Sequence, residues 1–143
     1  MSNRDLLLRI LDDAYVRKAW HGTNLRGSLR GVTAETALWR PGPNRHSIWE
    51  LALHCAYWKY AVRRRLTGVK RGAFSRKGSN WLPPGESWQK DLRLLGDEHR
   101  ALREAVARAT TPQLKKYEKL IYGVAAHDNY HTGQIQLIKR LHG

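Results

Sequence analysis

The chain has 143 residues, which is a usual size for one domain with a single sizeable core. Its 26 Lys and Arg residues against 12 Asp and Glu give a net charge of +14, a surplus that favours anionic partners. No run of 18 apolar residues is present and Cys55 is the single cysteine, which argues against a membrane span and a disulfide framework. We therefore expect one domain over residues 1–143, located in a reducing cytoplasm.

The first segment with helical periodicity covers residues 3–20. Its apolar face contains four residues at helical spacing: Leu7, Leu11, Ala14 and Tyr15. Ser2 or Asn3 can cap its start, and Gly22 is expected to close it. The connection that follows is irregular, with at most short helical turns, and its Pro-Gly-Pro stretch at 41–43 excludes a helix there.

Three more helices are expected in the rest of the chain. The second runs from about Ser47 to just before Gly68, with an inward stripe of Leu51, His54, Trp58 and Ala61. The third covers about 86–110, and its apolar stripe follows steps of three and four residues: Trp88, Leu92, Leu95, His99, Leu102, Val106 and Ala109. The fourth begins between 112 and 118 and ends near 141. Four such helices without a β-rich segment predict an all-α four-helix bundle.

The most informative feature is a pair of histidines, His127 and His131, in the run HDNYH of the fourth helix. Four residues are just over one helical turn, so both imidazoles project from one face. They continue an apolar stripe whose other members are Leu120, Val124, Ile135 and Ile138, and His54 lies on the inward stripe of the second helix. Buried imidazoles need partners, and either a shared metal ion or hydrogen bonds within the core would supply them.

Three stretches of the sequence resemble the DinB-like family, also called DinB/YfiT-like: HSIWELALHCAYW, FSRKGSNWLPP and HDNYHTGQIQLIKRL. The resemblance implies an up-down-down-up four-helix bundle with a divalent metal held near one end by three histidines. Carried over by motif, those ligands are His54, His127 and His131. The metals associated with such proteins are zinc, nickel, iron and manganese. Their known activities include thiol-dependent S-transfer, isomerisation and metal-dependent hydrolysis.

Several neighbouring side chains are candidates for supporting roles. Glu50 lies one turn before His54. It could approach the metal or accept a hydrogen bond from the outer nitrogen of that imidazole, or else face solvent in the first turn of the helix. Gln134 lies seven residues after His127 and either faces the cavity as a hydrogen-bond donor or sits at a polar boundary. His99 could replace His54 as third ligand, although a hydrogen-bonded core histidine is the favoured interpretation.

A zincin site is disfavoured by the same helix. The zincin motif places a glutamate directly after the first histidine, and here that position is Asp128. A third ligand downstream would have to be His142, which a helix carries about 16 Å away from His131. Helical rotation turns Asp128 away from the histidine face, so it is expected to matter little.

The leading functional hypothesis is a metal-dependent enzyme, either a hydrolase or a thiol-dependent S-transferase, that acts on a small molecule. The basic composition favours an anionic substrate or cosubstrate, and an open metal site could bind a thiol cosubstrate. The alternative is a non-enzymatic protein in which a structural metal stabilises the bundle and the basic segment 59–78 contacts nucleic acid. A homodimer is expected, because Trp39 and Tyr60 are predicted to be exposed aromatics that a partner would cover.

Overall fold

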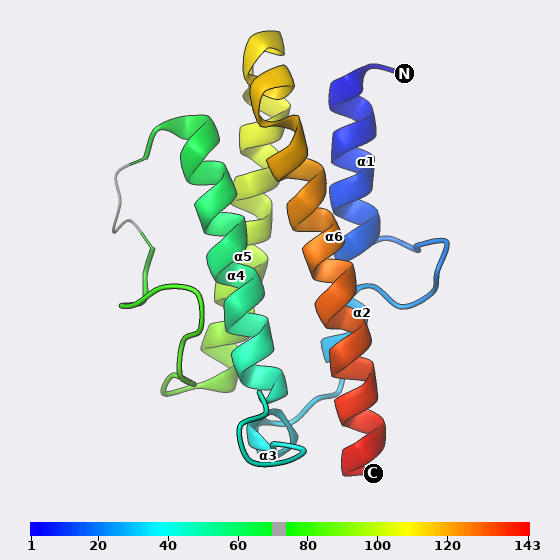
Figure 1. Ribbon diagram of the computed structural model, residues 1–143, viewed down its shortest axis with the longest axis vertical. Helices are drawn as coiled ribbons and strands as arrows, with labels where there is room; N and C mark the ends of the chain where they lie inside the picture. The colour runs from blue at the N-terminus through cyan, green and yellow to red at the C-terminus, as the bar shows by residue number, and fades with distance from the viewer. Residues whose placement is uncertain (70–73) are drawn as a thin grey trace.

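The computed structural model describes residues 1–69 and 74–143, and within those ranges it contains helices and no strand (Figure 1). Four long helices lie side by side: α1 Asn3–Tyr15, α4 Ile48–Thr67, α5 Trp88–Arg108 and α6 Thr111–His142. Two helices of one turn or so, α2 Leu25–Leu29 and α3 Ala34–Leu38, lie in the first connection. The predicted all-α bundle is therefore confirmed. No helix among the described residues combines the length and apolar character needed to cross a membrane.

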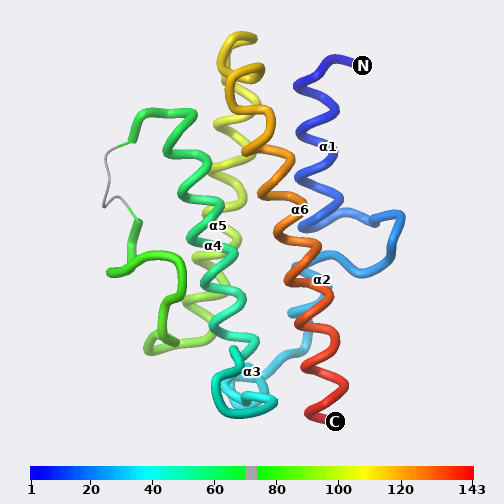
Figure 2. The backbone as a smooth tube through the Cα atoms, in the orientation of Figure 1, coloured from blue at the N-terminus to red at the C-terminus, as the bar shows by residue number. Residues whose placement is uncertain are grey.

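The helices follow the order that the resemblance implies. In Figure 2, α1 and α6 descend while α4 and α5 ascend, so the directions are down, up, up and down along the chain. Residues 74–87 run back along the bundle to the start of α5, which allows α4 and α5 to be parallel. α4 packs against α5 and α6, and α1 packs against the same two helices.

Polar residues at the helix ends explain most of the boundaries. Capping boxes begin α1, α4 and α6, with N-cap residues Ser2, Ser47 and Thr110. Gly68 ends α4 in the left-handed conformation, at φ +70°, as its position in the sequence predicted.

The predicted end of the first helix, near Trp20, is wrong because α1 ends at Tyr15. The N–H groups of Val16 and Arg17 both bond to the carbonyl of Asp12, and the Asn24 side chain donates to the carbonyl of Arg17. These contacts turn the chain towards α2 before Gly22 is reached. Local hydrogen bonds within residues 12–24, rather than Gly22, therefore accompany the end of the helix.

A layer of buried polar side chains divides the core into two apolar clusters. One cluster gathers the ends of the long helices near α2 and α3, with residues such as Leu53, Leu95 and Ile135. The other includes Leu11, Leu102 and Ile121. On α5 and α6 the polar residues lie between the two clusters in sequence, and those of α1 and α4 contact them or one another. Together they form what we call the polar layer, in which all members are buried except the half-buried His127: Asp12, His54, Lys59, His99, His127, Asp128 and His131.

Most predicted core positions are confirmed, and two are wrong. Leu7, Leu11, Ala14 and Tyr15 are all buried, as expected for α1. In contrast, Trp58 is 38% exposed and Leu120 is 41% exposed. The Trp58 indole donates to the side chain of Asn80 instead of entering the core, and α6 buries Ile121, one position after Leu120.

Candidate metal centre

Helices α4 and α6 bring the three predicted histidines together. The Nε2 atom of His127 lies 3.0 Å from Nε2 of His54 and 3.1 Å from Nε2 of His131. One ligand atom from each residue lies within 4.8 Å of the others, which is close enough to hold one metal ion. Imidazole nitrogens that share an ion at about 2.0–2.1 Å lie about 3–3.5 Å apart. We call these three residues the histidine site.

The hydrogen bonds on the outer side of the rings fix where two of the protons are. Nδ1 of His54 lies 3.0 Å from the carbonyl oxygen of Asn80, and Nδ1 of His131 lies 2.6 Å from Oε1 of Gln134. Because an oxygen acceptor requires a donor, both Nδ1 atoms carry the proton and both Nε2 atoms present lone pairs. Gln134 thus acts as an acceptor, whereas its sequence position had suggested a donor.

This arrangement fits a cation. His127 can place at most one proton on its Nε2, so at least one of the two close nitrogen pairs has no hydrogen between its lone pairs. Two lone pairs at about 3 Å repel each other unless a positive charge lies between them. The donor set of three neutral imidazoles is one that divalent transition metals prefer.

Burial keeps these imidazoles in the neutral form that ligands need. Desolvation is the main cause that lowers the pKa of His54 to about 4 and that of His127 to about 3. Desolvation also lowers the pKa of His131. Neighbouring imidazoles of the same site contribute to the shifts of His54 and His127. All three rings are therefore uncharged near neutral pH and do not have to lose a proton to bind a metal.

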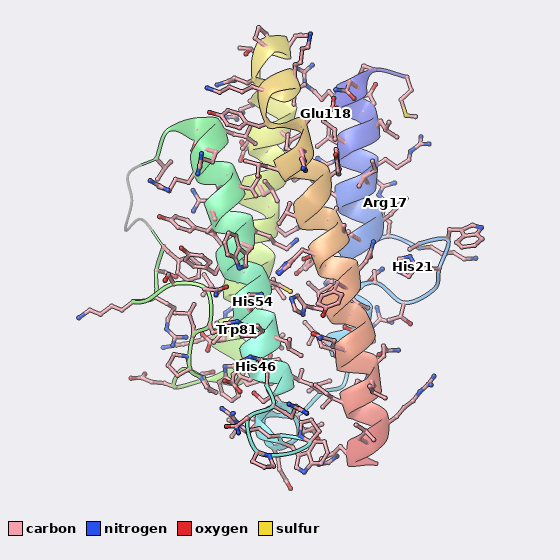
Figure 3. All side chains as sticks on the ribbon, in the orientation of Figure 1. Arg17, His21, His46, His54, Trp81 and Glu118 are labelled. Atoms are coloured by element: carbon pink, nitrogen blue, oxygen red, sulfur yellow. The ribbon has the colours of Figure 1, made fainter. Side chains whose placement is uncertain are left out.

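The connection between α4 and α5 clamps His54 from outside the bundle. The indole of Trp81 is stacked between His46 and His54, with ring centroids 3.6 and 3.7 Å away (Figure 3). Asn80, at φ +62°, holds Nδ1 of His54 through its carbonyl and accepts a hydrogen bond from the Trp58 indole through its side chain. The sequence analysis did not identify Asn80 as a partner of His54. The sole local signal was an Asn in a loop, a residue type that tolerates this backbone conformation.

Glu50 reaches the site indirectly. Its carboxylate accepts from the N–H and hydroxyl of Ser47, pairs with Arg40 at 2.9 Å and lies 3.7 Å from His46. The Nδ1 position of His54, for which Glu50 was a candidate acceptor, is occupied by Asn80. Glu50 therefore steadies His46, and His46 supports the Trp81 indole against His54.

The family comparison agrees with this geometry. Residues 17–135 match the model of the DinB superfamily. The chain belongs to the DinB superfamily. A comparison with curated proteins and one with solved structures each gave no match. The matched range of this DinB superfamily member includes all three histidines of the site.

Beside the site, Lys59 forms a buried ion pair that the sequence did not predict. Lys59 is fully buried, and its ammonium group pairs with Asp128 and lies 3.2 Å from Nδ1 of His99. Asp128 is fully buried, so it contributes to the packing of the bundle, a role that the sequence had not indicated. Burial raises the pKa of its carboxyl group, and Lys59 opposes that shift. His99 is the core histidine that was expected.

A second set of possible ligands is less suitable. Cys55, His127 and Asp128 also have ligand atoms within 4.8 Å of one another. The Asp128 carboxylate, however, is already paired with Lys59. Complete burial raises the pKa of the Cys55 thiol well above its ordinary value, which keeps it protonated and unsuited to binding metal. Cys55 is therefore a small core residue.

A pocket of about 780 Å³ adjoins the histidine site. His131 and Gln134 form one part of its wall, and His46 and Trp81 form another. Much of the remaining lining is apolar or aromatic, namely Leu51, Tyr130, Leu137, Ile138 and Leu141. Arg45 adds a cationic side chain.

Proposed function

We propose that this DinB superfamily member binds one divalent transition metal, zinc, nickel, iron or manganese, through His54, His127 and His131. We further propose that it is a metal-dependent enzyme, either a hydrolase or a thiol-dependent S-transferase. The observation that carries the proposal is that the Nε2 atoms of the three histidines converge. In His54 and His131 the Nδ1 proton is donated to Asn80 and Gln134, which leaves Nε2 free to bind a metal. That arrangement presents lone pairs to one point beside a pocket.

Different residues of the protein would bind the metal, orient its ligands and bind the substrate. A divalent ion held by three neutral ligands keeps its full charge and would supply Lewis-acid chemistry, lowering the pKa of a water or thiol at its open position. Asn80 and Gln134 fix the ring orientations, which a ligand set needs to keep its geometry. The apolar wall of the pocket would exclude water, and Arg45 would favour a substrate with an anionic group.

A catalytic metal has an open coordination position, whereas a structural metal does not. The absorption spectrum of cobalt bound at the site detects whether such a position can take a ligand. Cobalt-loaded protein titrated with 2-mercaptoethanol should develop a saturable thiolate-to-cobalt absorption band. The band should be absent in His131→Ala and unchanged in His21→Ala, which alters an exposed histidine. A cobalt spectrum that does not respond to the thiol would show a closed site and contradict an enzyme of this kind.

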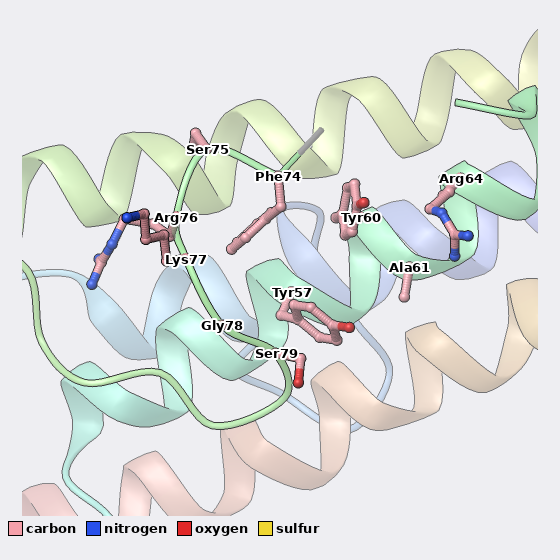
Figure 4. A pocket seen from close by; sticks show the side chains of 10 residues that line it. All are labelled: Tyr57, Tyr60, Ala61, Arg64, Phe74, Ser75, Arg76, Lys77, Gly78 and Ser79. Carbon is pink, nitrogen blue, oxygen red and sulfur yellow. The ribbon is translucent and has the colours of Figure 1, made fainter. Parts of the chain in front are cut away.

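The nucleic-acid alternative has no specific observation in its favour. In the basic segment 59–78, Lys59 is buried, Arg63 pairs with Glu98 and Arg76 pairs with Asp91, while residues 70–73 lie outside the described ranges. The pocket of about 640 Å³ beside this segment contains aromatic rings (Figure 4). Phe74 packs between Tyr57 and Tyr60 there, with centroids 5.6 and 5.1 Å away, instead of offering a free face for a base.

We also propose a homodimer in the cytoplasm, but on a different surface from the one expected. Tyr60 is buried and Trp39 is partly buried, so the reason first given for a dimer is wrong. The three most exposed of the large apolar side chains described on α6, Tyr130, Leu137 and Leu141, share one side of that helix. Light scattering that detects the monomer mass alone would exclude the dimer.

A further inference from the structure

A cavity of about 600 Å³ opens between α1 and α5, at the other end of the polar layer from the histidine site. Five guanidinium groups and two carboxylates line it, a surplus of three positive charges: Arg17, Arg26, Arg93, Arg100 and Arg103, with Asp12 and Asp97. So many cations around one cavity attract an anion.

Two of these arginines have no partner in the described part of the chain. Arg103 binds both oxygens of Asp12 at 3.0 and 3.1 Å, Arg17 lies 3.9 Å from the same carboxylate, and Arg100 pairs with Asp97. Among the residues that the structure describes, Arg26 and Arg93 have neither a hydrogen bond nor an ion pair. Two planar donor groups are thus free at the cavity.

His99 places a buried donor in the wall of the same cavity. Its Nδ1 faces the ammonium of Lys59, which can only donate, so the proton of the neutral ring is on Nε2. This Nε2 is buried without a hydrogen-bond partner in the described part of the chain, and it lies 3.5 Å from Oδ1 of Asp12. The side chain is 3% exposed, and Tyr15 fixes the ring by stacking at 4.0 Å. A buried N–H without an acceptor is costly, and a ligand oxygen would satisfy it.

We propose that this cavity binds a small molecule that carries phosphate groups. Guanidinium groups bind phosphate oxygens in pairs, and Arg26 and Arg93 would supply such contacts, with Arg100 adding charge. The N–H of His99 would donate to one further oxygen. The volume is within the range of small-molecule sites. The site shares no residue with the histidine site, so it does not depend on the proposed metal or reaction.

Pyrophosphate is a suitable probe, and calorimetry in the presence of EDTA removes any contribution from a metal. The full chain should bind one pyrophosphate saturably. The double variant Arg26→Ala/Arg93→Ala should bind at least about 10-fold more weakly, because two charge-assisted contacts are lost. The control Arg9→Ala/Arg65→Ala removes the same charge from exposed positions outside the cavity and should change the affinity less than about 2-fold.

Nuclear magnetic resonance locates the bound ligand. Pyrophosphate should shift the ¹⁵N resonance of His99 Nε2 and leave that of the exposed His21 unchanged. Calorimetry with a single-stranded oligonucleotide then tests whether a long polyanion binds without pyrophosphate binding. Absence of saturable pyrophosphate binding, an equal loss in both double variants, or an unshifted His99 resonance would each overturn the proposal. Oligonucleotide binding without pyrophosphate binding would indicate diffuse attraction to a basic surface and would overturn it as well.

Discussion

At the scale of single residues, the three imidazoles differ in the hydrogen-bond partner of Nδ1, the ring nitrogen that faces away from the site. His54 is held by the Asn80 carbonyl and His131 by the Gln134 amide, while Nδ1 of His127 is buried without a partner among the described residues. Outer partners of this kind fix the tautomer and orientation of a ligating ring. Gln134 is therefore the side chain whose loss tests the arrangement without removing a ligand.

Gln134→Ala should weaken metal binding by about 10–100-fold, because the His131 ring loses the acceptor that orients it. The dissociation constant for zinc, measured by competition with a chromophoric chelator, checks this. Gln89→Ala, on the surface of α5, is the matched control and should leave the constant unchanged. Equal constants for wild type and Gln134→Ala would show that the hydrogen bond does not contribute.

Asp128→Asn should destabilise the protein by about 3 kcal/mol, because it leaves the Lys59 ammonium buried without its counter-charge. Urea unfolding of the folded variant measures the loss. The double variant Lys59→Met/Asp128→Asn removes the uncompensated charge and should recover part of the lost stability. A cost below about 1 kcal/mol for Asp128→Asn would mean that the pair is not important for stability.

At the scale of the elements, periodicity and caps predicted most of what the structure contains. The sequence correctly predicted several features that depend on nearby residues. They are the cap at Ser2, the limits of α4 between Ser47 and Gly68, and the shared face of the two histidines in α6. The ion pair of Lys59 and the carbonyl of Asn80 could not be predicted in the same way. Each depends on a contact with a residue more than 20 positions away, and only the packed bundle shows which basic side chains are buried.

The start of α4 sets the position of His54 and offers a test of its cap. Ser47→Ala should cost about 1–2 kcal/mol, because the serine is buried and forms a reciprocal capping box with Glu50. Ser2→Ala removes a similar box at the exposed start of α1 and should cost about 0.5 kcal/mol. Urea unfolding compares the two variants, and equal costs would contradict the role assigned to burial.

At the scale of the whole molecule, the polar layer joins two sites through the middle of the bundle. Contacts continue from Asp12 at the arginine-lined cavity through His99 and Lys59 to Asp128, the residue beside His127. Two apolar clusters on either side of this layer bury most of the hydrophobic residues. The stability of the bundle is thus tied to the protonation of groups in its centre.

Stability of the metal-free protein should fall as the pH is lowered from about 7.5 to 5. Burial lowers the pKa of His99 to about 3, that of His127 to about 3 and that of His54 to about 4, against 6.5 for an ordinary histidine. Below pH 6.5 the unfolded chain binds protons that the folded chain does not, so acid favours unfolding. Urea unfolding across this range checks the slope, and the same stability at pH 7.5 and 5 would contradict it.

The central claim is that His54, His127 and His131 hold one metal ion. Its most direct test is the metal content of protein purified without an affinity tag, exposed to excess zinc and desalted before mass spectrometry. We predict one zinc per chain in wild type and in His21→Ala, and none in His131→Ala or His54→Ala, with helical circular dichroism retained in all four. A metal-free wild type, or zinc that remains in both site variants, would contradict the account.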